Sequence, residues 1–204
     1  MKLIQLIKQA SLYFIGLFIF LMGASLFLIV HGKANSFLLI NHFHNQWLDS
    51  FFSKFTFLGD GIFALIISLL FLIFKKKKAS LLALITFAFS GLVAQLIKQI
   101  ANSPRPKLFF KPDVYVHFVD GVTVSSNFSF PSGHTTTAFA VATLIVLISE
   151  KKIIRLPLLL IAMLVGYSRI YLGQHFLLDV ITGAFIGTIS SLITVYFAEK
   201  RTKK

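Results

Sequence analysis

The sequence predicts an all-α, polytopic membrane protein, a bundle of six transmembrane helices with an interfacial helix after the first span. Of the 204 residues, 56% are hydrophobic and only 13% are charged, whereas about 25% of the residues in globular proteins are charged. The apolar residues form runs long enough to cross a bilayer, and basic residues lie at the ends of these runs. We expect a single domain over residues 1–204.

This composition excludes several classes of protein. High hydrophobicity excludes an intrinsically disordered chain. The net charge of +13 does not indicate a soluble nucleic-acid binder, because the basic residues of such a protein would lie on a polar surface, and no nucleic-acid partner is expected. The absence of cysteine excludes a disulfide scaffold, a zinc–thiolate site and a thiol nucleophile.

The six spans follow from runs of about 20 mainly apolar residues, the length that crosses the hydrocarbon core. Residues 10–30 contain no charge and form the first span, which is longer than the core of a signal peptide. Residues 34–55 are mixed and rich in aromatic residues, which favours a helix lying at the interface. The remaining five spans are predicted at 56–74, 79–99, 134–149, 156–172 and 176–198.

Six spans place both termini on one side of the membrane, and the distribution of Lys and Arg identifies that side. The termini and the connections at 75–78 and 150–155 hold thirteen of the twenty cations, and the opposite side holds seven. The positive-inside rule therefore predicts cytoplasmic termini. We expect a multi-pass membrane protein, with the long 100–133 loop and the functional site on the outer side.

The helix ends on this outer side carry residues suited to holding a phosphate. Lys98, Arg105 and Arg169 can neutralise a dianion, and each arginine can bind two of its oxygens at once. Ser132 and Gly133 precede a helix, where free N–H groups and the positive end of the helix dipole form an anion site. The pattern therefore predicts a phosphate-binding cluster.

Two histidines and one carboxylate supply the reactive groups. His175 and Asp179 are four residues apart, so on a helix they share a face. The carboxylate can accept a proton from one imidazole nitrogen and leave the other nitrogen free to attack. His134 is then available as a general acid for the leaving alkoxide and later as a base for water. This chemistry requires neither a metal nor a cofactor, and none is expected.

Three gapped segments resemble the signature motifs of the type 2 phosphatidic acid phosphatase (PAP2) superfamily: Lys98-x6-Arg105-Pro106, Pro131-Ser132-Gly133-His134 and Ser168-Arg169-x5-His175-x3-Asp179. The resemblance implies that His175 forms a phosphohistidine, that Asp179 polarises it and that His134 protonates the leaving group. It also implies that the phosphoryl oxygens are held by Lys98, Arg105, Ser132, Gly133 and Arg169.

The resemblance further implies a protein of the bacterial cell (inner) membrane, with the site on the periplasmic or extracellular side, and a substrate class. Members of the membrane-bound branch hydrolyse a lipid phosphomonoester or diphosphate, such as undecaprenyl diphosphate, phosphatidylglycerophosphate, phosphatidic acid or lipid A. A phosphotransferase that passes the phosphoryl group to a lipid or sugar acceptor would use the same residues. A non-catalytic transporter or binder of lipid phosphates would need no nucleophile, so the pairing of His175 with Asp179 argues against it.

Other patterns have simpler interpretations. His175 and Asp179 could ligate zinc, but no third ligand has suitable spacing and the nearby cations would repel a metal ion. The remaining histidines, among them His117, fit hydrated interface positions. Asp60 fits a turn better than a pocket. The Gly-x-x-x-Gly pattern at 183–187 favours packing within the chain over dimerisation, and no oligomer is predicted.

Overall fold

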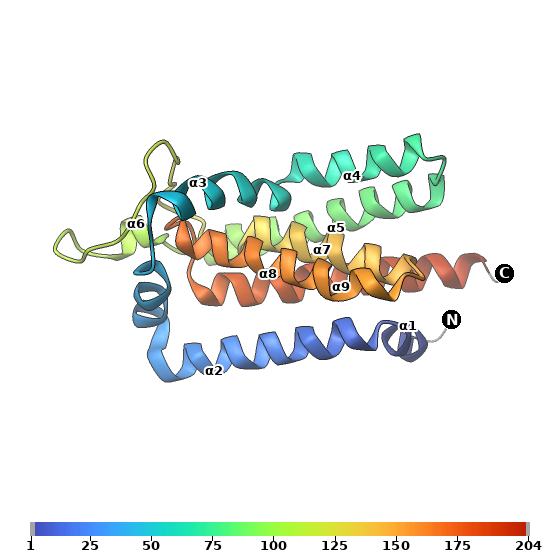
Figure 1. Ribbon diagram of the computed structural model, residues 1–204, viewed down its shortest axis with the longest axis horizontal. Helices are drawn as coiled ribbons and strands as arrows, with labels where there is room; N and C mark the ends of the chain where they lie inside the picture. Colours follow the sequence, from blue (N-terminus) through green and yellow to red (C-terminus); the bar gives the residue numbers. More distant parts are fainter. Residues whose placement is uncertain (1–2, 203–204) are drawn as a thin grey trace.

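The computed structural model describes residues 3–202, and every regular element in this part of the chain is helical, as expected. The long helices run along the length of the molecule (Figure 1). One end of the molecule holds helix α1 and the C-terminal part of α9. The other end holds α3, α6 and the connection from α6 to α7. The elements are α1 (Leu3–Gln9), α2 (Ser11–Asn41), α3 (Gln46–Phe55), η1 (Thr56–Gly59), α4 (Gly61–Ile73), α5 (Lys77–Ala101), α6 (Pro106–Phe109), α7 (Gly133–Ile148), η2 (Lys152–Ile154), α8 (Arg155–Tyr171) and α9 (Leu177–Thr202).

Helices occupy all six segments expected to span the membrane, but not all of these helices are long enough. Helix α7 has 16 residues, fewer than the about 20 that a span requires. The helices before and after Asp60 form a pair bent by 57°, which counts as one further span at most. Length and composition therefore support four to five spans, and the count of six stays a prediction. The four that qualify alone are Ser11–Asn41, Lys77–Phe109, Lys152–Tyr171 and Leu177–Lys200.

The segment 34–55, expected to be one helix, is divided between α2 and α3. Helix α2 continues to Asn41 with a break at Gly32, whose φ of 71° lies in the left-handed region that glycine adopts without steric cost. Helix α3 begins only at Gln46, where the Asn45 side chain caps it by accepting a hydrogen bond from the Leu48 N–H over 2.9 Å. The placement of α3 at a membrane interface stays a prediction.

Helix α7 is the central helix of the bundle. It packs against α5, α8 and α9, and eleven of its 16 residues are buried. Glycine allows α9 to approach closely: a Cβ on Gly183 would lie 2.7 Å from the Ser132 carbonyl oxygen, and one on Gly187 would collide with the Thr136 carbonyl oxygen. The two glycines therefore face α7 within the same chain. This contact places the N-terminal ends of α7 and α9 side by side.

Candidate active site

The residues of the three motifs meet at the end of the bundle that carries α3 and α6. The Ser132 N–H donates to the Asp179 carbonyl oxygen over 3.0 Å, and Arg105 donates to the Gln174 side chain over 2.8 Å. The charges of the three motif cations all act on His134. The structure thus gathers the eight residues expected in the site: Lys98, Arg105, Ser132, Gly133, His134, Arg169, His175 and Asp179.

His175 and Asp179 form a buried pair. The Nδ1 atom of His175 lies 3.3 Å from Oδ2 of Asp179, and each side chain is 2% exposed. His175 lies just before α9 rather than on it, but Asp179 is in the first turn of that helix and still reaches the ring. Burial lowers the pKa of the His175 imidazole to about 3, so the ring is neutral at pH 7. With the Nδ1 proton directed at the carboxylate, the lone pair on Nε2 is free.

The carboxylate of Asp179 is held by further donors. The Ser129 hydroxyl donates to its Oδ2 over 2.5 Å, and the Phe176 N–H donates to the same oxygen over 2.9 Å. Ser129 is fully buried, and its own N–H donates to the Ser103 carbonyl oxygen. These bonds fix the carboxylate, and therefore also fix the orientation of the imidazole beside it.

The start of α7 has free backbone N–H groups that could hold an anion. Ser132 caps the helix by accepting hydrogen bonds from the N–H of Thr135 at 3.4 Å and from its hydroxyl at 2.9 Å. Because the Ser132 N–H donates to α9, the N–H groups that remain at this end are those of Gly133 and His134, which have no partner among the described residues. A Cβ on Gly133 would meet nothing within 4 Å, so the backbone here borders open space.

The three cations lack a carboxylate partner within residues 3–202. Lys98 donates to the Phe128 carbonyl oxygen over 2.7 Å, and Arg169 donates from Nη1 to the Thr56 hydroxyl over 2.7 Å. The Nε atom of Arg169 is buried without a partner in the described part of the chain. A buried guanidinium N–H without an acceptor is costly, so this atom favours a bound anion.

Asp60 faces the second histidine of the site. Its Oδ2 lies 3.6 Å from Nε2 of His134, while its Oδ1 accepts from the Ile62 N–H over 2.8 Å and caps α4. Gly59 allows this approach, because a Cβ there would lie 2.6 Å from the His134 carbonyl oxygen. Asp60 is therefore a turn residue, as expected, and also a neighbour of the site.

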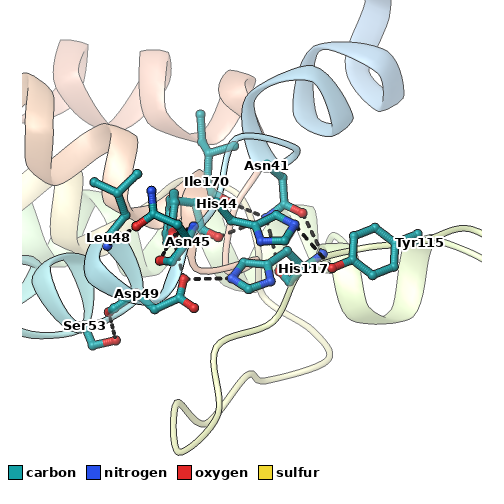
Figure 2. A network of polar contacts seen from close by, with 10 residues as sticks. Asn41, His44, Asn45, Leu48, Asp49, Ser53, Tyr115, His117 and Ile170 are labelled. Carbon is teal, nitrogen blue, oxygen red and sulfur yellow. Dashed lines mark hydrogen bonds and ion pairs between the residues drawn. The ribbon is translucent and has the colours of Figure 1, made fainter.

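The connection from α6 to α7 is attached to α2 and α3 by the polar network in Figure 2. Asn41 accepts from the His117 N–H over 2.8 Å and donates to the His117 carbonyl oxygen over 3.1 Å. The His117 ring stacks on His44, with centroids 3.8 Å apart, and its Nε2 lies 2.8 Å from Oδ1 of Asp49. The prediction that His117 lies in a hydrated interface position is wrong, because its side chain is only 12% exposed.

Sequence reasoning missed three residues that contact the predicted site. Ser129 binds Asp179, Thr56 binds Arg169, and the side-chain amide of Gln174 lies between Arg105 and the Thr123 carbonyl oxygen. Gln174 directly precedes His175, and Ser129 lies two residues before Pro131. This closeness to motif residues was the only available signal. Thr56 lies 42 residues before the first motif residue, and nothing in the sequence connects it with the site.

Comparison with known proteins identifies the family. The model of the PAP2 superfamily matches residues 79–203. The chain is 33% identical to phosphatidylglycerophosphatase B of Bacillus subtilis strain 168 over 76% of this chain and 77% of the relative. It is 29% identical to an undecaprenyl-diphosphatase of Sulfolobus acidocaldarius over 90% of this chain and 89% of the relative.

A solved structure agrees with these matches. The crystal structure of a transmembrane PAP2-type phosphatidylglycerolphosphate phosphatase from Bacillus subtilis superposes with a TM-score of 0.66 and 29% identity, covering 91% of this chain and 96% of the other. The fold, the spacing of the three motifs and the family model lead to the same result. The chain belongs to the PAP2 superfamily.

Proposed function

We propose that this protein is a membrane phosphatase that removes a phosphate from a lipid phosphomonoester or diphosphate through a phosphohistidine intermediate, without a metal ion. One observation carries the proposal: a buried His175 paired with Asp179 lies in a group of three cations that have no carboxylate partner in the described chain. Such a group attracts a phosphate and presents a nucleophile to it.

The first half of the reaction transfers the phosphoryl group to the enzyme. The lone pair on Nε2 of His175 attacks phosphorus, and the bond from phosphorus to the oxygen of the lipid or of its remaining phosphate breaks. His134 gives its proton to that leaving oxygen. Lys98, Arg105, Arg169 and the N–H groups at the start of α7 stabilise the charge that spreads over the phosphoryl oxygens.

The second half restores the enzyme. His134, now neutral, accepts a proton from water, and the water oxygen attacks the phosphorus of the phosphohistidine. The bond between phosphorus and Nε2 breaks, inorganic phosphate leaves, and both histidines return to their starting protonation states. Asp179 keeps the His175 ring oriented and stabilises the positive charge that the ring carries while it is phosphorylated.

Asp60 serves this mechanism as a positioning residue. The charges that act on His134 are positive on Lys98, Arg105 and Arg169 and negative on Asp60. The general acid must hold a proton before the first step, and a neighbouring carboxylate favours the protonated ring. Asp60 therefore opposes part of the effect of the three cations, which favour loss of the proton from His134.

Replacing Asp60 with asparagine tests this role. Asparagine caps a helix as well as aspartate does, so Asp60→Asn keeps the cap of α4 and removes only the charge. We expect kcat/KM to fall about tenfold, and the basic limb of its pH profile to move down by about one pH unit. Asp60→Ser, which also caps, should give the same shift. An unchanged pH profile in both variants, with only a lower melting temperature, would limit Asp60 to capping.

Purified protein tests the proposed function directly. We expect release of inorganic phosphate from at least one of undecaprenyl diphosphate, phosphatidylglycerophosphate, phosphatidic acid and lipid A. The activity should persist in EDTA and be inhibited by vanadate, which mimics the five-coordinate phosphoryl group. A strict requirement for Mg²⁺ would contradict the mechanism. Transfer to an added lipid or sugar alcohol in place of phosphate release would identify a phosphotransferase.

We also propose that the termini lie in the cytoplasm of a bacterial cell and that the phosphate site faces the periplasm or the exterior. The cations near α1 and at the connections on that end of the bundle support this orientation. A tag inserted between residues 112 and 125 should react with an impermeant label on intact cells, whereas a C-terminal tag should not. The opposite labelling pattern would reverse the orientation.

A further inference from the structure

The end of the bundle opposite the phosphate site contains a cavity of about 1480 Å³. It lies between α1, the connection from α4 to α5, the connection from α7 to α8, and the last turns of α9. Two glutamates, Glu150 and Glu199, line it, but the cationic side chains outnumber them: Lys8, Lys75, Lys76, Lys77, Lys78, Lys151, Lys152 and Arg155.

Arg155 distinguishes this cavity from a cluster of lysines that would only orient the protein in the membrane. The lysines at 75–78 are exposed, as residues that only orient a membrane protein would be. Arg155 is only 8% exposed, and its buried Nε has no hydrogen-bond partner among the described residues. A buried guanidinium N–H without an acceptor is costly unless a ligand supplies one. The cavity therefore fits an anion that reaches as far as Arg155.

The wall of the same cavity is apolar. Leu6, Phe71, Leu82 and Val195 line it, and these four residues belong to one hydrophobic cluster between α1, α4, α5 and α9. A soluble anion would use the basic side chains and leave this wall empty. A lipid would use both, since its phosphate and its acyl chain have matching chemistry.

We propose that this cavity binds the phosphate-bearing headgroup of an anionic phospholipid, with a phosphate at Arg155 and the start of an acyl chain along Phe71 and Leu82. Basic pockets between transmembrane helices on the cytoplasmic side bind anionic headgroups of this kind. The site is separate from the reaction site at the other end of the bundle and does not depend on the proposed phosphatase activity.

Native mass spectrometry of the full chain in detergent measures this binding. Cardiolipin is the probe, because it carries two phosphates, and phosphatidylcholine, which is zwitterionic, is the reference lipid. We expect cardiolipin adducts on the wild type well above phosphatidylcholine adducts, and Arg155→Gln should weaken cardiolipin binding about tenfold. The double variant Lys76→Gln/Lys77→Gln keeps the buried arginine and should also weaken binding, which provides a second test if Arg155→Gln folds poorly.

Lys200→Gln is the matched control, because Lys200 lies on α9 at the same end of the molecule but does not line the cavity. It should bind cardiolipin as the wild type does. Equal binding of cardiolipin and phosphatidylcholine, or an equal loss in Lys200→Gln, would overturn the proposal. If inorganic diphosphate raises the melting temperature through Arg155 while cardiolipin does not bind, the ligand is a soluble phosphate and the lipid assignment is wrong.

These outcomes are independent of the reaction. Arg155 is far along α8 from Arg169, at the opposite end of that helix. Phosphate release by Arg155→Gln in detergent should therefore equal that of the wild type. Loss of lipid binding with full activity would bear on the proposed lipid site alone. Loss of activity with intact lipid binding would bear on the proposed phosphatase function alone.

Discussion

Replacing His175 with alanine should lower phosphate release by at least about 10⁴-fold, because the reaction then has no nucleophile and no covalent intermediate. The side chain is 2% exposed and is the histidine paired with Asp179. The phosphoenzyme itself is a second readout. Wild-type protein quenched during turnover should carry an acid-labile, base-stable phosphate that His175→Ala lacks.

The control is His42→Ala, which removes an exposed histidine at the same end of the molecule. This variant should keep full activity and the phosphoenzyme. Melting temperatures of both variants show whether the fold is intact. Turnover by folded His175→Ala on every lipid phosphate in the panel would show that another residue is the nucleophile, and the mechanism proposed above would be wrong.

Replacing His134 with alanine should lower kcat by about 10² to 10⁴-fold, the usual contribution of a general acid–base group. The loss depends on the leaving group. A lipid alkoxide needs a proton as it departs, whereas p-nitrophenolate is stable without one. With p-nitrophenyl phosphate the first step should therefore recover, and the phosphohistidine should accumulate, because the second step still lacks the base that activates water.

This combination separates His134 from a residue that only binds phosphate. Arg169→Ala should impair lipid phosphates and p-nitrophenyl phosphate to the same extent and should not accumulate phosphoenzyme, since the lost guanidinium holds oxygens common to both substrates. If His134→Ala loses activity equally on both substrates and never accumulates the intermediate, His134 is not the acid–base group.

The sequence predicted where the helices lie better than where they bend. Runs of apolar residues locate a helix, because crossing a bilayer requires a minimum number of such residues. They contain little information about a break such as that at Gly32, where one φ angle redirects α2. They also do not show that the chain around Asp60 is bent by 57°, because a run of apolar residues does not specify the angle between two successive helices.

The site was predictable where its residues form motifs and not elsewhere. Arg105, His134 and Arg169 have fixed spacing from other motif residues, and the structure gathers them. Thr56 and Asp60 reach the same place from a helix pair far earlier in the chain. Their contribution depends on the close packing of η1 against α7 at Gly59, a three-dimensional contact that no local pattern encodes.

The enclosure of α7 by other helices also determines how deep the reaction lies. A helix that faces protein rather than lipid does not have to match the bilayer, and 16 residues span about 24 Å, less than the hydrocarbon thickness of about 30 Å. We therefore expect a phosphate bound at Gly133 to lie below the level of the headgroups, where a lipid could present it without leaving its leaflet. In the proposed reaction, the dephosphorylated lipid then stays among its neighbours while the inorganic phosphate departs into water.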